Sequence, residues 1–349
     1  FIIIQQEKGY QYNNNPAPAQ KIPLALVYNR VVDLKIHEMS GLFGCFCLDE
    51  KKDGLGMDQE GDNTILAIDL YNKGTVAQAK GNLEEAVNFY KQSISLDGEN
   101  FKAFYNLGSA LQETAAGLQQ AAAAAGAGVG AGFDRARRRT VLDACAAYEQ
   151  AIDLKEDHVL AHYNLGYIRH QLGQHARALH HLEEAARLDP ADVDTFIMIG
   201  NILRETRRFP EAVERYRAAA AIDGGCVMAL YNLANTLHDL RRFDEAIKYF
   251  LQALDLEPNL THAHFNLGIS YQAKQDIENA FQAYSRAAKL DPGFEDARAA
   301  AQRMKRKLDG RQHSQSTSSY YSQNDRQNAS GEYNRDQDSD PGKQNGGRG

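Results

Sequence analysis

Apolar, small and polar positions along this chain recur with a period of 34 residues. Segments of the form aromatic-Asn-Leu-small occupy 105–108, 163–166, 231–234 and 265–268, and the last three are 68 and 34 residues apart. The apolar segment 197–200 falls at the place that the longer step leaves open. A fixed period of this length is typical of stacked helix-turn-helix units, each of which buries its apolar face against its neighbours. The pattern therefore predicts one array of helix pairs, rather than the two domains that 349 residues would otherwise suggest.

Six frames of the pattern can be aligned: 67–100, 101–158, 159–192, 193–226, 227–260 and 261–294. Position 8 of each frame is small, namely Gly74, Gly108, Gly166, Gly200, Ala234 and Gly268. Position 20 is alanine in every frame, and position 24 is bulky. Small residues at positions 8 and 20 allow two antiparallel helices to cross closely, while the bulky residue fills the layer around the crossing. Position 32 is a helix-stopping residue in five frames, namely Gly98, Pro190, Gly224, Pro258 and Pro292.

The second frame is 24 residues longer than the others. The extra residues lie at about 115–138 and include an alanine run, the Gly/Ala segment 126–132 and three arginines. Because insertions in repeat arrays usually leave the stack intact, we predict a loop here, with the second helix restarting at Thr140. The Gly/Ala segment lacks the sixth-place glycine of a dinucleotide loop and the Lys-Ser/Thr pair of a phosphate loop, so we interpret it as low-complexity sequence.

The flanks of the array differ from it in composition. Residues 295–308 place Ala299, Met304 and Leu308 on one helical stripe, which predicts a helix that caps the last repeat. Residues 309–349 are rich in Ser, Gln, Asn, Asp and Gly, which predicts a disordered polar tail. Residues 1–66 form a poorly defined N-terminal segment. The chain opens with Phe1, and Met39 offers an alternative start, so residues 1–38 are open to interpretation as native or as translated upstream sequence.

The 34-residue period with these small and bulky positions resembles the tetratricopeptide repeat family. The resemblance implies an all-α, right-handed solenoid of six helix-turn-helix repeats over 67–294, followed by the capping helix. It also implies that the first helix of each repeat lines a concave groove. The expected function is then that of a noncatalytic scaffold or adaptor that binds an extended peptide segment of a partner protein.

The candidate groove residues are amides and aromatics at fixed positions of the first helices. Position 6 is asparagine in five frames, namely Asn72, Asn106, Asn164, Asn232 and Asn266. Further groove candidates are Tyr105, Tyr163, Tyr231, Phe265, Asn201 and Asn235. An amide can pair with any peptide main chain, and an aromatic ring adds apolar contact area. The array is similar to the asparagine ladder of O-linked N-acetylglucosamine transferases, but the same asparagines could instead stabilise contacts between repeats, and we weigh the two equally.

Two further interpretations follow from the resemblance. The chain could be the substrate-recognition region of a protein O-glycosyltransferase without its catalytic domain. A carboxylate-clamp chaperone partner is not expected, because position 5 is aromatic or Ile197 and position 6 is never arginine.

Charge and composition narrow the function classes. The chain has 39 Lys and Arg against 46 Asp and Glu, a net charge of −7, which argues against nonspecific nucleic-acid binding. No apolar run reaches 18 residues, so a transmembrane segment is not expected. Four cysteines and the absence of a secretory signal favour a cytoplasmic location, with the nucleus as an alternative. Acylation of Cys45 and Cys47 would tether the chain to a membrane, but we interpret them as reduced thiols.

Catalytic and metal chemistry is not expected from the sequence. No catalytic triad, paired-acid motif or CxxC pair is evident, so the chain is predicted to be no enzyme and to need no cofactor. Histidines gather at 158–181, and His158 and His162 share a helical face, but we interpret them as core-edge or surface residues rather than metal ligands. The basic clusters 135–139 and 303–307 are interpreted as solvated charge runs.

Overall fold

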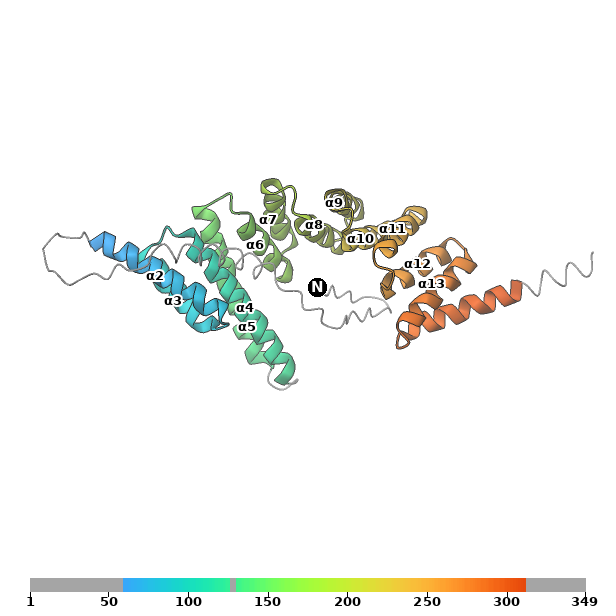
Figure 1. Ribbon diagram of the computed structural model, residues 1–349, viewed down its shortest axis with the longest axis horizontal. Coiled ribbons are helices and arrows are strands. Elements are labelled where there is room, and N and C mark those ends of the chain that lie inside the picture. The colour runs from blue at the N-terminus through green and yellow to red at the C-terminus, as the bar shows by residue number, and fades with distance from the viewer. Residues whose placement is uncertain (1–58, 126–129, 312–349) are drawn as a thin grey trace, which may run out of the picture. The chain divides into compact units, whose positions relative to one another are not determined.

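The structure is a computed structural model that describes residues 59–125 and 130–311, and within these ranges every regular element is an α-helix (Figure 1). The helices are α2 (Gln59–Ala79), α3 (Leu83–Leu96), α4 (Phe101–Ala125), α5 (Gly130–Leu154), α6 (Val159–Gln171), α7 (His175–Leu188), α8 (Val193–Glu205), α9 (Phe209–Ile222), α10 (Val227–Asp239), α11 (Phe243–Leu256), α12 (Thr261–Ala273) and α13 (Ile277–Leu290). A further helix follows at 295–311. The predictions for residues 1–58, including Cys45 and Cys47, and for the tail after 311 lie outside the described residues.

Consecutive helices pack in antiparallel pairs that stack on one another (Figure 1). The pairs are α2–α3, α4–α5, α6–α7, α8–α9, α10–α11 and α12–α13. The second helix of each pair also packs against the first helix of the next pair. The predicted all-α solenoid is therefore confirmed. None of the helices in the described ranges is long and apolar enough to cross a membrane.

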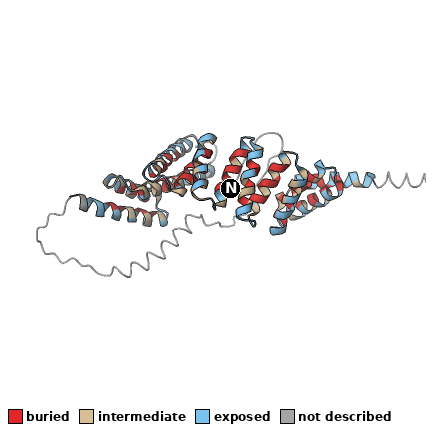
Figure 2. Cartoon of the chain, turned by 90° about the horizontal axis from the view of Figure 1, so that it is seen from above, coloured by how far each residue is buried: buried red, intermediate tan, exposed pale blue. Residues whose placement is uncertain are grey.

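The core of each pair is a close crossing between a small residue and a large ring or leucine. A Cβ atom added at Gly200 of α8 would lie 2.6 Å from Cε1 of Tyr216 in α9, and one added at Gly268 would lie 2.7 Å from the ring of Tyr284. The rings of Tyr90, Tyr148, Tyr216 and Phe250 are fully buried, as are the alanines at position 20. Figure 2 shows the buried residues on the helix faces that meet one another. The residues aligned in the sequence are thus the ones that set the distance between helices.

The turns inside the pairs share one backbone conformation. The fifteenth residue of each regular frame has a positive φ, namely Gly81, Gly173, Arg207, Arg241 and Gln275. Only glycine adopts this region without steric cost, so the three other residues hold a conformation that L-amino acids rarely take. Between pairs, the chain turns at an aspartate whose carboxylate accepts a hydrogen bond from the backbone two residues on, as at Asp189, Asp223 and Asp291.

The described residues of the insertion in the second frame, 115–125 and 130–138, are helical, so the predicted loop was wrong over these residues. Residues 115–125 extend α4, and residues 130–138 belong to α5. Each of these two helices therefore has 25 residues, whereas α6 has 13 and α7 has 14. Thr140 does not begin a helix, because it lies inside α5 and its hydroxyl donates to Ala136 O at 3.0 Å. Alanine is the strongest helix former, so the alanine run prolongs the helix rather than ending it.

The helix at 295–311 packs on α13, in the place predicted for a cap. Ala297, Ala300, Ala301 and Met304 are buried in one cluster with residues of α12 and α13, and Leu308 packs against its edge. Ala299 is exposed, so its predicted place on the apolar stripe was wrong. The buried stripe begins two residues earlier than the sequence pattern suggested.

Because of the close crossing, alanine substitutions at two glycines should change the free energy of unfolding in opposite directions. Gly200→Ala should lower the free energy of unfolding by about 1–2 kcal/mol, because the new methyl group overlaps the buried ring of Tyr216. Gly117→Ala, in the exposed part of α4 with nothing within 4 Å, should raise it by about 0.5–1 kcal/mol through helix propensity. Urea unfolding followed by circular dichroism measures both. Equal stabilisation by the two substitutions would contradict the crossing argument.

Candidate interaction surface

The first helices of the pairs expose a common surface. Helix α2 contacts α4, and α8 contacts both α6 and α10, while α10 also contacts α12. Residues at positions 2, 5 and 9 of a helix lie on one face, since they are separated by three and four residues. We define the first-helix surface by these positions. It comprises Ile68, Tyr71, Thr75, Lys102, Tyr105, Ser109, Leu160, Tyr163, Tyr167, Asp194, Ile197, Asn201, Met228, Tyr231, Asn235, His262, Phe265 and Ile269. Of these, Ile197 and the predicted groove residue Phe265 are buried in the core.

The position-6 asparagines bind the tyrosines of the preceding pair. Asn106 Nδ2 donates to Tyr71 Oη at 3.1 Å, and Asn266 Nδ2 donates to Tyr231 Oη at 3.0 Å. Asn164 Nδ2 lies 3.4 Å from Tyr105 Oη in the same relationship. Asn232 and Asn266 are only 8% exposed, whereas Asn72, which lies in the first pair of the described residues, is exposed. These amides form the contacts between repeats that the sequence left as one of two interpretations.

The bond pattern breaks where the sequence breaks. In α8 the tyrosine is replaced by Ile197 and the asparagine by Met198, and both are buried. Asn232 therefore has no tyrosine in α8, and its Nδ2 donates to Asn201 Oδ1 at 3.2 Å instead. The same oxygen accepts the Tyr216 hydroxyl at 2.6 Å. Asn201 thus takes the place of the missing tyrosine as the acceptor for Asn232, and it connects α8 to both α9 and α10.

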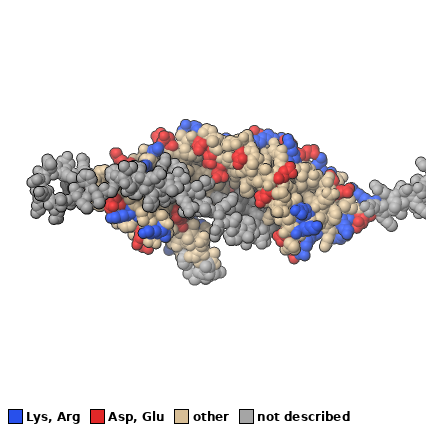
Figure 3. Space-filling model, viewed as in Figure 1, with Lys and Arg blue, Asp and Glu red and all other residues tan. Residues whose placement is uncertain are grey.

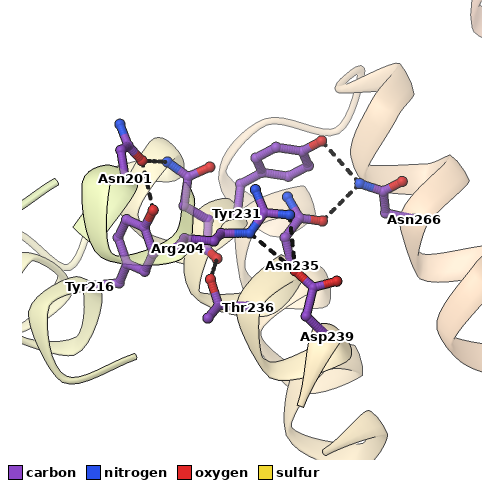
Figure 4. Close-up of polar contacts among 9 residues, drawn as sticks. Asn201, Arg204, Tyr216, Tyr231, Asn235, Thr236, Asp239 and Asn266 are labelled. Carbon is purple, nitrogen blue, oxygen red and sulfur yellow. Dashed lines mark hydrogen bonds and ion pairs between the residues drawn. The ribbon is translucent and has the colours of Figure 1, made fainter. Parts of the chain in front are cut away.

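Figure 4 shows this polar network across α8, α10 and α12. Asn235 Oδ1 accepts from Asn266 Nδ2 at 2.8 Å. Hydrogen bonds between asparagine side chains therefore join α10 to α8 on one side and to α12 on the other. Arg204 of α8 pairs with Asp239 of α10 at 3.0 Å. The Nδ2 atom of Asn201 points away from the other residues drawn and has no partner within the described ranges. Of the predicted groove residues, Asn201 therefore offers a free donor.

Exposed apolar side chains accompany the tyrosines. Leu160 is 44% exposed and Met228 is 48% exposed, and each lies one turn before a tyrosine of the same helix, Tyr163 and Tyr231. Ile68 has the same relationship to Tyr71 and is 51% exposed. These three residues are not among the groove residues predicted from the sequence. The signal that could have found them is an apolar residue at position 2 of the frame, three residues before the aromatic position.

Burial raises the pKa of Tyr71, Tyr163 and Tyr231 on this surface, so these three side chains remain neutral hydroxyls at physiological pH. For Tyr71 and Tyr231 the main cause is desolvation, which the hydrogen bonds from neighbouring asparagines only partly offset. For Tyr163 the acidic side chains of Asp192 and Asp194 add to the effect of burial. A neutral hydroxyl can both accept the asparagine N–H and donate to another group.

Basic side chains gather over the C-terminal helices (Figure 3). Arg303, Lys305, Arg306 and Lys307 are exposed on the last helix and make no ion pair within the described residues. A shallow depression of ≈ 590 Å³ lies beside them, lined by Gln272, Gln275, Ile277, Lys307, Gly310 and Arg311. Exposure of these side chains is what the interpretation as a solvated charge run expects.

The histidines that share a face of α6 have structural partners. His158 caps the helix, because its Nδ1 accepts from Ala161 N at 3.1 Å. His162 is buried, with Nε2 3.0 Å from Glu156 O and Nδ1 3.5 Å from His181 Nδ1. In the described part of the chain, neither His158 nor His162 belongs to a group that could hold a metal ion.

The asparagine contacts lead to a matched pair of variants. Asn266→Ala should lower the free energy of unfolding by about 1–3 kcal/mol, because it removes bonds to Tyr231 and Asn235 in a buried place. Asn72→Ala changes the same position of the frame where the side chain is exposed, and should change stability by less than about 0.5 kcal/mol. Urea unfolding measures the difference. Equal effects would show that the amides do not tie the pairs together.

A pH dependence follows from His181. Burial, with His162, His180 and Arg169 nearby, lowers the pKa of His181 to about 4, while Glu184 acts weakly in the opposite direction. The unfolded chain, with an ordinary histidine pKa of about 6.5, then binds a proton more readily than the folded chain. Stability should therefore fall as the pH drops from about 6.5 towards 4. His181→Gln should reduce this slope in urea midpoints measured against pH. His180→Gln, at an exposed neighbour, should reduce it far less, because burial is the main cause of the low pKa of His181.

Family models for the tetratricopeptide repeat match along the described helices. Models described as tetratricopeptide repeat match residues 197–261, 239–293 and 159–192, and one described as TPR repeat matches 78–114 and 143–173. No curated protein matches the sequence.

Solved structures share the fold. The crystal structure of YrrB, described as a TPR protein with an unusual peptide-binding site, covers 61% of this chain and 97% of its own, with 19% identity and a TM-score of 0.50. A MamA structure covers 57% of this chain and 93% of its own, with 21% identity and a TM-score of 0.47. PilF of Pseudomonas aeruginosa covers 72% and 100%, with 15% identity and a TM-score of 0.49. At 19% identity, the similarity to YrrB shows the fold alone.

Proposed function

This chain belongs to the tetratricopeptide repeat family of protein-interaction scaffolds, and we propose that its first-helix surface binds an extended peptide segment of a partner protein. The observation that carries the proposal is the set of exposed apolar residues at position 2 of every second first helix, Ile68, Leu160 and Met228, beside the tyrosines at position 5. Exposed leucine and methionine next to aromatic rings offer contact area for the side chains of a partner. The fold of YrrB, which is described as having a peptide-binding site, is consistent with this use of the surface.

The sequence offered the position-6 asparagines as candidate contacts for a peptide main chain, and the present proposal does not depend on that role. Their Nδ2 atoms already hold neighbouring pairs together, so replacing them would disturb the array as well as the surface. Asn201 keeps a free N–H group, which can donate to a carbonyl oxygen of the peptide main chain. We expect apolar contacts to provide most of the affinity and Asn201 to orient the main chain.

The partner segment need not be charged. At positions 2, 5 and 9, formal charges come only from Lys102 and Asp194, and the nearby Arg204 is neutralised by Asp239. This favours a segment whose side chains alternate apolar and neutral polar character. Within the described residues, nothing favours the alternative of a glycosyltransferase recognition region.

The test begins with peptides selected on the full chain from a random peptide display library. Fluorescence anisotropy then gives the Kd of a selected synthetic peptide for each variant. Leu160→Glu combined with Met228→Glu should weaken binding about tenfold or more, because two exposed contact residues become charged.

The matched control changes two leucines that are equally exposed on second helices. Leu142→Glu and Leu251→Glu, in α5 and α11, should leave the Kd within about twofold. Circular dichroism confirms that both double variants fold. The proposal is overturned if the control pair weakens binding as much as the first pair, or if no peptide is selected at all.

A further inference from the structure

Three side chains from separate helices meet at one edge of the array. His170 lies in the last turn of α6, His175 begins α7, and Glu205 ends α8. One candidate ligand atom from each lies within 4.8 Å of the others, and His170 Nε2 is 3.5 Å from Glu205 Oε2. Gly173, with a φ of 71°, folds the chain back between the two histidines, so that their ring centroids are 5.6 Å apart.

Both imidazoles carry a buried nitrogen without a partner. The Nδ1 atoms of His170 and His175 are buried and make no hydrogen bond within the described residues. Buried polar atoms are almost always paired, so two such atoms in one cluster indicate a ligand that satisfies or orients these rings. The contact between His170 and Glu205 uses Nε2 of His170, so the Nδ1 atom of each ring still has no hydrogen-bond partner.

The repeat pattern explains why His170 is free to act. At the same position of other pairs, Gln78, Gln112 and Gln272 accept the hydroxyl of the position-24 tyrosine. The pair of α6 and α7 has Leu182 at position 24, which has no hydroxyl to donate. In the pair with Phe250, the corresponding His238 lies 3.0 Å from the Ser270 hydroxyl instead. His170 has neither partner, and it contacts Glu205 and His175 instead.

We propose that His170, His175 and Glu205 bind a divalent transition-metal ion of the zinc class. Two imidazoles and one carboxylate suit zinc, cobalt and nickel, and do not suit magnesium or calcium, which prefer oxygen ligands. With metal–ligand bonds of about 2.0–2.2 Å, ligand atoms of a tetrahedral site lie about 3.4 Å apart, close to the separation of His170 and Glu205. The fourth position is left for water or for a side chain of a partner.

The ion would link two consecutive repeats. His170 and His175 belong to one helix pair, and Glu205 to the next, so binding would restrain the junction between α6 and α8. Since the metal binds only when all three residues are brought together, it should stabilise the folded chain by mass action. This consequence does not depend on peptide binding.

The test uses the full chain, free of any polyhistidine tag and stripped of metal with a chelator. Isothermal titration with zinc chloride should give one tight ion per chain, and cobalt(II) should give the visible absorption of a tetrahedral nitrogen–oxygen site. His175→Gln and Glu205→Gln should each weaken zinc binding about tenfold or more. His180→Gln, an exposed histidine on the same helix outside the cluster, is the matched control and should leave the affinity unchanged.

Thermal unfolding supplies a second measurement. Zinc at about a hundredfold excess over its Kd should raise the Tm of the wild-type chain by about 5 °C or more, and this shift should disappear in His175→Gln. In the absence of metal, His175→Gln and Glu205→Gln should both keep the helical circular dichroism of the wild-type chain. The proposal is overturned if the wild-type chain binds no stoichiometric zinc, or if His180→Gln reduces binding as much as His175→Gln.

Discussion

The array depends on the close crossing of the two helices in each pair. Where position 8 is glycine and position 24 is tyrosine, the ring lies directly against the glycine Cα, and a Cβ atom would come within 2.6–2.8 Å of it. This contact sets how deeply the second helix packs against the first. The large rings at this crossing are fully or almost fully buried, so each pair has its own small core and needs only its neighbours to complete it.

A second layer of contacts ties the pairs together through polar atoms. The tyrosine hydroxyls of one first helix accept the asparagine N–H groups of the next, and the position-24 tyrosines donate to glutamine or Asn201 of their own pair or repeat. Tyrosine supplies an apolar body for packing and a hydroxyl for bonding, so the same residue type serves both layers. Two departures from this pattern change the polar contacts around them. Ile197 and Met198 shift the bonding onto Asn201, and Leu182 leaves His170 beside His175 and Glu205.

The residues of the repeat differ in burial according to their position. Positions 8, 20 and 24 are buried, and Asn106, Asn164, Asn232 and Asn266 at position 6 contact the preceding pair. The exposed residues at positions 2, 5 and 9 of the first helices form the surface proposed for partner binding. Helices α4 and α5 are the longest helices of the described residues. Their extra length does not change the crossing of this pair, because Gly108 and Tyr148 keep their contact. An insertion can enter such an array because each pair contacts only its neighbours.

The sequence by itself determined the fold class, the pairing of helices and the residues of each crossing. It did so because a 34-residue period forces equivalent residues into equivalent places, as with Gly200 and Tyr216. It could not determine what the asparagines contact, because an amide can bond equally to a neighbouring helix or to a peptide. Nor could it bring His170, His175 and Glu205 together, since Glu205 lies thirty or more residues from both histidines and joins them only when α8 stacks on α6 and α7. The tertiary structure decided these points, because hydrogen bonds and metal ligands depend on distances that a linear pattern does not contain.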